Sequence, residues 1–228
     1  MTQLSYPDIE AAAARISGRV RPVTVASARP GNTPEAPTTT AATWSSPPSI
    51  DPTGSGVHFA LEFMQYTGSF KARGAQNFIQ AHLAEGPFPE AGVTIASGGN
   101  AGLACAWAAR DAGVPATVFL PSNAPAVKVE RLRGYGAEVR LIGAEYAEAA
   151  LACHEFVESS GALASHAYDH RLIAAGAGTM LTEILSQIPA LDTIVVSAGG
   201  GGLFAGVATA ATVHGVRTGA GGGRACRR

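Results

Sequence analysis

The strongest constraint on the fold of this chain is an alternation of apolar runs and helical patterns that begins near residue 91. One helix of this alternating series is expected around Gly178 to Ile188, after a turn through the sequence SHAYDH. Strands that alternate with helices predict an α/β fold in which parallel sheets are flanked by helices. Strands are predicted at 92–97, 116–121, 137–142 and 192–198, the last of them buried, and helices at 100–113, 124–136, 144–161 and 202–215.

Two segments do not share this alternation. Residues 28–56 are rich in Pro, Thr, Ser and Gly, and we expect a loop-like or disordered segment there. Residues 217–228, with the sequence RTGAGGGRACRR, show no hydrophobic period, and we expect an irregular tail.

The composition indicates a globular protein and excludes several function classes. Of the 228 residues, 46% are hydrophobic and 14% charged, which is enough apolar material to bury a core. The net charge of −1 offers no basic excess for binding nucleic acid. Cys105, Cys153 and Cys226 form no CxxC motif, so the sequence predicts neither a disulfide framework nor a metal site.

The N-terminus and the longest uncharged stretch bear on membranes. The N-terminus contains Asp8 and Glu10 and lacks an apolar signal-peptide core. The stretch from Thr193 to Val216 has no charged side chain, but four consecutive glycines interrupt it, which favours a strand, a turn and a helix over a membrane span. We therefore expect a soluble cytoplasmic protein that does not bind membranes.

A first loop of interest, SGGNAG, runs from Ser97 to Gly102 between a predicted strand and a predicted helix. Ligands of α/β sheets gather at the carboxyl ends of strands, and a helix N-terminus favours negative charge. Asn100 could bind a ligand oxygen or could simply cap the helix. The residues alone leave both interpretations open.

A second loop, SAGGGGLFAG, runs from Ser197 to Gly206 in the same strand-to-helix position. Four glycines in succession allow backbone N–H groups to surround a phosphate at the helix N-terminus. The sequence is neither a P-loop nor a GxGxxG fingerprint. A flexible linker is the alternative, and the flanking strand and helix patterns argue against it.

A lysine, Lys71, follows Gly68, Ser69 and Phe70 and precedes a run that predicts a helix. Most lysines in such a place are surface residues whose charged end reaches water. In a partly desolvated pocket, a lysine instead loses basicity, and its amine can condense with an aldehyde. A phosphate loop, a polar loop and an activated lysine together indicate pyridoxal 5′-phosphate (PLP) as the cofactor.

Three motifs carry a family resemblance: TGSFKARGA (67–75), SGGNAG (97–102) and GGGGL (199–203). In this order they resemble the fold-type II PLP enzymes, and most closely the serine/threonine dehydratase (threonine ammonia-lyase) family. Supporting stretches lie at 8–20, 115–139 and 174–184, and the resemblance covers about residues 6–25 and 57–216. It implies the two-domain fold of that class, which is like that of the tryptophan synthase β subunit.

The resemblance implies a role for each matched residue. Lys71 would carry PLP and then move the α-proton, and Phe70 would pack beside the pyridine ring. The phosphate would be bound by backbone N–H groups of the second loop. The catalytic residue would be Lys71, and the substrate carboxylate would be bound by Ser97, Asn100 and Ala101. Asn100 would also bond the 3-hydroxyl of the cofactor. The residues that would bind the cofactor are Phe70, Lys71, Asn100, Gly199, Gly200, Gly201, Gly202 and Leu203.

The reaction that the resemblance implies is deamination of a small amino acid. L-Threonine would give 2-oxobutanoate and ammonia, and L-serine would give pyruvate and ammonia. Serine racemases place a second serine where this chain has Gly98, which disfavours racemisation. The alanine after the asparagine, Ala101, resembles serine dehydratases and threonine synthases alike. A threonine synthase-like or other β/γ-replacement enzyme therefore stays an alternative, as does an inactive PLP-binding remnant.

The chain also departs from the family pattern. Family members continue beyond the glycine loop with further strands and with the Ser or Cys that bonds the pyridine nitrogen, so the resemblance implies that a C-terminal part is missing. Reading-frame shifts or a truncated gene are our hypothesis for 28–56 and 217–228. The expected organisation is 1–56 in the large domain, 57–163 as the small domain, and 164–228 as the rest of the large domain. The resemblance is compatible with a homo-oligomer.

Overall fold

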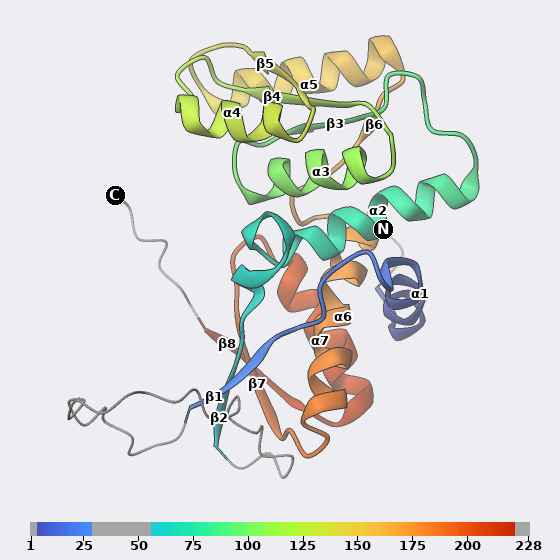
Figure 1. Ribbon diagram of the computed structural model, residues 1–228, viewed down its shortest axis with the longest axis vertical. Helices are drawn as coiled ribbons and strands as arrows, with labels where there is room; N and C mark the ends of the chain where they lie inside the picture. Colours follow the sequence, from blue (N-terminus) through green and yellow to red (C-terminus); the bar gives the residue numbers. More distant parts are fainter. Residues whose placement is uncertain (1–3, 29–55, 222–228) are drawn as a thin grey trace, which may run out of the picture.

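The computed structural model describes residues 4–28 and 56–221 of the chain (Figure 1). Most of the segment 28–56, which was expected to be loop-like, lies outside the described residues. Within the described ranges, no helix is both long and apolar enough to cross a membrane. The uncharged stretch from Thr193 forms a strand, a glycine turn and a helix, as its glycines predict. The strand was expected to be buried, but only Val196 of its five residues is buried, because among the described residues this strand pairs with one other strand alone.

A four-stranded parallel sheet forms the upper part of the molecule in Figure 1. Its strands lie in the order β5-β4-β3-β6, and α5 lies above the sheet while α3 lies below it. This arrangement confirms the α/β alternation that the sequence predicts. The elements are β3 (Val93–Ala96), α3 (Asn100–Asp111), β4 (Ala116–Leu120), α4 (Ala126–Gly134), β5 (Glu138–Leu141), α5 (Tyr146–Ser160) and β6 (Leu163–Ala164).

A group of helices with a small parallel sheet forms the lower part of the molecule (Figure 1). Helix α6 begins at Arg171, well before the expected Gly178, because the His170 side chain caps it by accepting a hydrogen bond from the Leu172 N–H. The elements are α1 (Tyr6–Ile16), α2 (Lys71–Glu85), α6 (Arg171–Gln187), β7 (Thr193–Ser197), α7 (Gly202–His214) and β8 (Arg217–Gly221).

Strand β8 corrects one prediction. Residues 217–228 were expected to form an irregular tail, but Arg217–Gly221 pair in parallel with β7 over its full length. Backbone hydrogen bonds suffice for this pairing, so the glycine-rich sequence needs no side-chain pattern. Residues 222–228 lie outside the described part of the chain.

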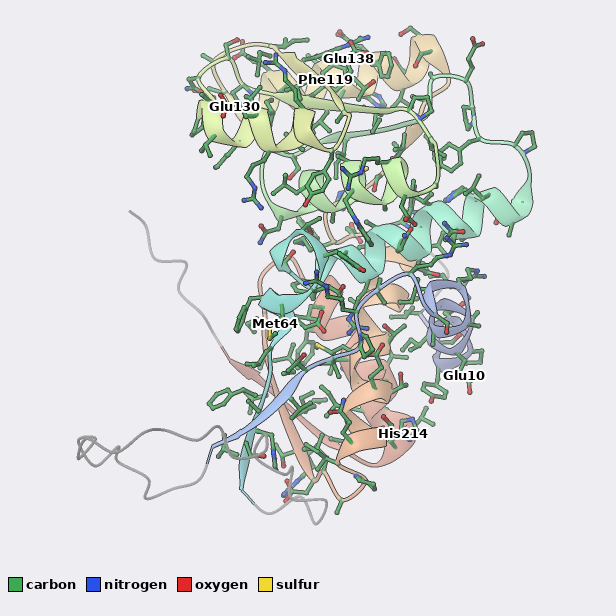
Figure 2. All side chains as sticks on the ribbon, in the orientation of Figure 1. Glu10, Met64, Phe119, Glu130, Glu138 and His214 are labelled. Atoms are coloured by element: carbon green, nitrogen blue, oxygen red, sulfur yellow. The ribbon has the colours of Figure 1, made fainter. Side chains whose placement is uncertain are left out.

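A short antiparallel pair precedes the site. Strand β1 (Val25–Ala28) pairs with β2 (Val57–Ala60), and the chain then passes through the 3₁₀ turns η1 (Glu62–Met64) and η2 (Tyr66–Gly68) before α2 begins. Figure 2 shows Met64 on η1, and its side chain is exposed. The sequence patterns did not predict these short elements.

Two large apolar cores lie on either side of α2 and α6. One is built from α2, α3, β3, β4 and α4, and the other from α1, α6, α7 and β7. A smaller cluster surrounds Phe119 of β4 (Figure 2) and includes residues of α5. The expected domain boundary at residues 163 and 164 stays a prediction. Helices α2 and α6 come from opposite sides of that boundary and pack closely against each other.

Candidate active site

The chain turns sharply just before Lys71. Thr67 and Gly68 both have left-handed backbone conformations, with φ values of 64° and 80°. Ser69 returns to an extended conformation, and α2 then begins at Lys71. Threonine rarely adopts positive φ, because its Cβ crowds the backbone there. This turn places Lys71 at the first position of a helix whose next eight residues are all buried.

The Lys71 amine is held inside the molecule. Its Nζ donates a hydrogen bond of 2.7 Å to the carbonyl oxygen of Ala167, and it lies 5.1 Å from the centre of the Phe70 ring. Burial lowers the pKa of Lys71 below its ordinary value, because the charged form loses water. A larger share of this amine is therefore neutral near physiological pH than for a surface lysine.

The glycine loop follows β7 and leads into α7. Strand β7 ends at Ser197, and Gly201 caps the helix with a φ of 91°. The first N–H groups of a helix have no partner inside it, and the helix dipole is positive at that end. A Cβ added at Gly200 would stand 2.3 Å from the Tyr168 ring, and one at Gly202 would stand 2.5 Å from the Tyr168 carbonyl oxygen. Backbone therefore blocks a side chain at Gly202, whereas a side chain at Gly200 would have to displace the Tyr168 ring.

Lys71 and the glycine loop line one cavity of about 250 Å³. Its residues come from the start of α2, the segment before α6, the first half of α6, the end of β7, and the glycine loop with the first turn of α7. This cavity brings together seven of the predicted site residues. Its lining consists of Phe70, Lys71, Ala167, Tyr168, Ile173, Ala177, Ser197, Gly199, Gly200, Gly201, Gly202, Leu203 and Phe204.

The asparagine loop does not line this cavity. Ser97, Asn100 and Ala101 lie between the end of β3 and the first turn of α3, where Asn100 is exposed and Ala101 is buried. The Ser97 hydroxyl accepts a weak hydrogen bond of 3.4 Å from the Gly99 N–H. The roles expected of these three residues in binding substrate or the cofactor hydroxyl stay predictions.

The sequence patterns did not assign six of the residues that line the cavity, among them Ala167 and Tyr168. Both lie in the turn SHAYDH between β6 and α6. His166 orders this turn, because its Nδ1 accepts hydrogen bonds from the N–H groups of Tyr168 and Asp169. The contact from Lys71 to Ala167 spans 96 residues, so no local pattern could have indicated it.

Across residues 4–28 and 56–221, no group of three or more His, Cys, Asp or Glu side chains is arranged to hold a metal ion.

Comparison with known proteins decides the family. Residues 34–218 match the model of the PALP family, which is described as pyridoxal-phosphate dependent enzyme. The chain belongs to this family. PALP membership confirms the resemblance drawn from the three motifs, and pyridoxal phosphate is the cofactor of the family.

Similar sequences include an L-threonine ammonia-lyase and an L-threonine dehydratase. The chain is 44% identical over 157 residues to an L-threonine ammonia-lyase of Geobacter sulfurreducens, a match that covers 69% of this chain and 39% of that protein. It is 42% identical over 158 residues to a catabolic L-threonine dehydratase of Staphylococcus aureus, covering 69% of this chain and 45% of that protein. This chain thus covers less than half of the length of either relative.

Solved structures confirm the fold-type II class. Maize serine racemase matches with a TM-score of 0.78 and 33% identity over 95% of this chain and 60% of that chain. A threonine deaminase from the organism abbreviated T.th. matches with a TM-score of 0.75 and 30% identity, over 92% of this chain and 61% of that chain.

The cavity residues fit pyridoxal phosphate. Lys71 offers an amine for its aldehyde, and the first turn of α7 offers backbone N–H donors for its phosphate. The missing Cβ atoms of Gly200 and Gly202 leave room beside Tyr168 that a larger residue would fill. Lys71, Gly199, Gly200, Gly201, Gly202 and Leu203 are the residues that could hold the cofactor.

Proposed function

We propose that this chain carries the cofactor site of an ammonia-lyase that converts L-threonine to 2-oxobutanoate, or L-serine to pyruvate, with release of ammonia. The observation that carries this proposal is the single cavity shared by the Lys71 amine and the glycine loop. The names of the two threonine-deaminating relatives support the choice of substrate.

Pyridoxal phosphate, when bound, supplies the electron-withdrawing group that makes the α-hydrogen of an amino acid acidic. Lys71 would hold the cofactor, and its amine would remove the proton from the substrate Cα. Its lowered pKa suits this role, because a neutral amine can accept that proton. The N–H groups of Gly202 and Leu203, at the positive end of α7, bind the phosphate.

The substrate carboxylate is assigned to Ser97, Asn100 and Ala101 at the start of α3, with the Asn100 amide also assigned to the cofactor hydroxyl. A helix N-terminus is a favourable place for a carboxylate. Phe70, beside Lys71, is assigned to the cofactor ring. Racemisation is a minor reaction in this proposal, because Gly98 supplies no hydroxyl to deliver a proton to the opposite face.

The test is 2-oxo acid formation from L-threonine and from L-serine, by the chain purified with added pyridoxal phosphate. Lys71 and Lys128 are the two lysines of the chain, and Lys128 is exposed on α4, which makes Lys128→Ala a matched control. Lys71→Ala should lower kcat about 10²- to 10⁴-fold, the usual contribution of a positioned acid–base group. Lys128→Ala should leave it unchanged. Equal activity of the two variants contradicts the proposal.

Product analysis separates this function from its alternatives. A β- or γ-replacement enzyme releases a substituted amino acid instead of a 2-oxo acid. A cofactor-binding remnant shows a Lys71-dependent change in the visible absorbance of pyridoxal phosphate but releases no product. A cytoplasmic location and a homo-oligomeric state belong to the same proposal on sequence grounds, and light scattering tests the second.

A further inference from the structure

Arg73, two residues after Lys71, is the most deeply buried charged side chain near the site. Its guanidinium has no exposed surface. It pairs in bidentate fashion with Glu62, through hydrogen bonds of 3.0 Å from Nε and 2.8 Å from Nη2. It pairs in the same way with Glu183, at 2.7 Å from Nη1 and 3.0 Å from Nη2. The planar fork of a guanidinium, with five donors, is suited to bind two carboxylates in bidentate fashion at once.

The two carboxylates come from different parts of the chain. Glu62 lies in η1, just before the turn that leads to Lys71, and Glu183 lies on α6. Arg73 also donates to the carbonyl oxygen of Arg21 at 3.3 Å and to the Thr179 hydroxyl at 3.4 Å. This guanidinium therefore ties together the N-terminal segment, the approach to Lys71, and the two helices α2 and α6.

The charge balance shows that the cluster is built around the guanidinium. Burial alone would lower the pKa of Arg73, but hydrogen bonds and charge from Glu62 and Glu183 more than offset this and raise it. The carboxylates keep some contact with water, with side chains 12% and 30% exposed. A buried cation that lost one carboxylate would be poorly compensated, so the cluster resists rearrangement.

The position of the Lys71 amine depends on the same helices. Lys71 is the first residue of α2, and its acceptor, the Ala167 carbonyl, lies four residues before the first residue of α6, Arg171. The Asn77 amide on α2 also donates to the Leu172 carbonyl on α6 at 2.7 Å. Any sliding of α2 along α6 would therefore disturb the hydrogen bond from Nζ to the Ala167 carbonyl.

We propose that Arg73 is a positioning residue for Lys71: its paired carboxylates fix α2 against α6 so that the Lys71 amine stays desolvated in the cavity beside the glycine loop. The idea rests on the proposed function of Lys71, but its effect on the amine exists before any cofactor binds. A purely structural Arg73 would stabilise the fold without changing the ionisation of Lys71.

The experiment uses the two lysines of the full chain as probe and internal reference. The chain without cofactor is acetylated briefly at a series of pH values, and peptide mass spectrometry gives separate rates for Lys71 and Lys128. The pH profile of each rate is the readout, because greater access alone raises a rate without moving its profile. In the wild-type chain, we expect the Lys71 profile to rise at lower pH than that of Lys128.

Two variants test the proposal. Arg73→Lys keeps the charge but cannot form the two bidentate pairs, and Glu183→Gln keeps the shape but removes one charge. The second variant preserves the Glu62 pair, so it still gives an answer if the first does not fold. Both should move the Lys71 profile toward that of Lys128, with a loss of neutral amine near neutral pH of about tenfold, the change that one pKa unit produces.

The control is Leu132→Ala, a buried truncation on α4 that lowers stability without touching the cluster. Its Lys71 profile should match that of the wild type. An unchanged Lys71 profile in Arg73→Lys or Glu183→Gln overturns the proposal, as does an equal shift in Leu132→Ala. Failure of the wild-type chain to bind pyridoxal phosphate would count against the proposed function alone, because acetylation is measured without cofactor.

Discussion

Gly74 of α2 and Gly176 of α6 are in direct backbone contact. A Cβ added at Gly176 would stand 2.6 Å from the Arg73 carbonyl oxygen and 2.7 Å from the Gly74 Cα. A Cβ added at Gly74 would stand 2.7 Å from the Ile173 carbonyl oxygen. Backbone atoms, rather than flexible side chains, block both positions. The two helices that place Lys71 and its acceptor therefore meet at a contact that admits only glycine.

Gly176→Ala should destabilise the chain, because the added methyl group must push α2 and α6 apart. Overpacking of this kind costs about 1–3 kcal/mol. Urea denaturation followed by circular dichroism measures the loss. Gly134→Ala on α4 is the matched control, since its Cβ would meet nothing within 4 Å. The control should gain about 0.4–1 kcal/mol. Equal stability of Gly176→Ala and the wild type would show that the helix contact is looser than described.

The His170 cap predicts a stability that depends on pH. Burial, with the nearby His82 and His166, lowers the pKa of His170, while Asp169 acts in the opposite direction. The unfolded chain then binds the proton more tightly than the folded chain does. Stability from this residue is therefore present above the ordinary histidine pKa of about 6.5 and is lost as the pH falls below it.

His170→Asn should remove this dependence while keeping a cap for the Leu172 N–H, because asparagine is a good helix cap that does not titrate. The measurement is the urea midpoint of wild type and variant at about pH 5 and about pH 7.5, on either side of the histidine range. We expect the wild type to lose more stability between the two than the variant. Parallel losses would assign the pH effect to other groups.

The glycine loop predicts a difference between neighbouring glycines. Gly200→Ala would drive a methyl group into the Tyr168 ring, whereas Gly199→Ala would place it in open space. Displacing the ring or the loop costs about 1–3 kcal/mol. The affinity of Gly200→Ala for pyridoxal phosphate should therefore be lower than that of Gly199→Ala by a factor of about ten or more, since 1.4 kcal/mol is a factor of ten in Kd. Fluorescence titration gives both constants, and equal affinities would rule out this role for Gly200.

Much of the fold could be predicted from the sequence. Strands β3, β4 and β7 are mainly apolar runs, β5 alternates charged and apolar residues, and their helices have clear periods and end signals. The elements that were missed carry no such pattern. Strand β6 is two residues long, and β8 has the sequence RTGAG, so both depend on backbone pairing alone. The early start of α6 depends on a histidine cap, which is less common than the usual capping residues.

The residues of the candidate site likewise include some that could be predicted from the sequence and some that could not. Lys71 and the glycine loop could be predicted because a turn, a lysine and a row of glycines are local features. Ala167 and Tyr168 could not be predicted, because the whole four-stranded sheet lies between them and Lys71 in the sequence. Arg73 resembled any arginine on a helix until its partners, 11 and 110 residues away, were known.

The two sides of the cavity differ in how firmly the rest of the molecule supports them. Lys71 opens a helix buried on nearly every side, whereas the glycine loop follows a strand of a two-stranded sheet whose Val195 is 72% exposed. Backbone amides of β7 should therefore exchange with deuterium sooner than those of α2, because thinly packed segments open locally first. A ligand bound to both sides would close that gap, so the cofactor would act as a structural brace for the weaker half of its own site.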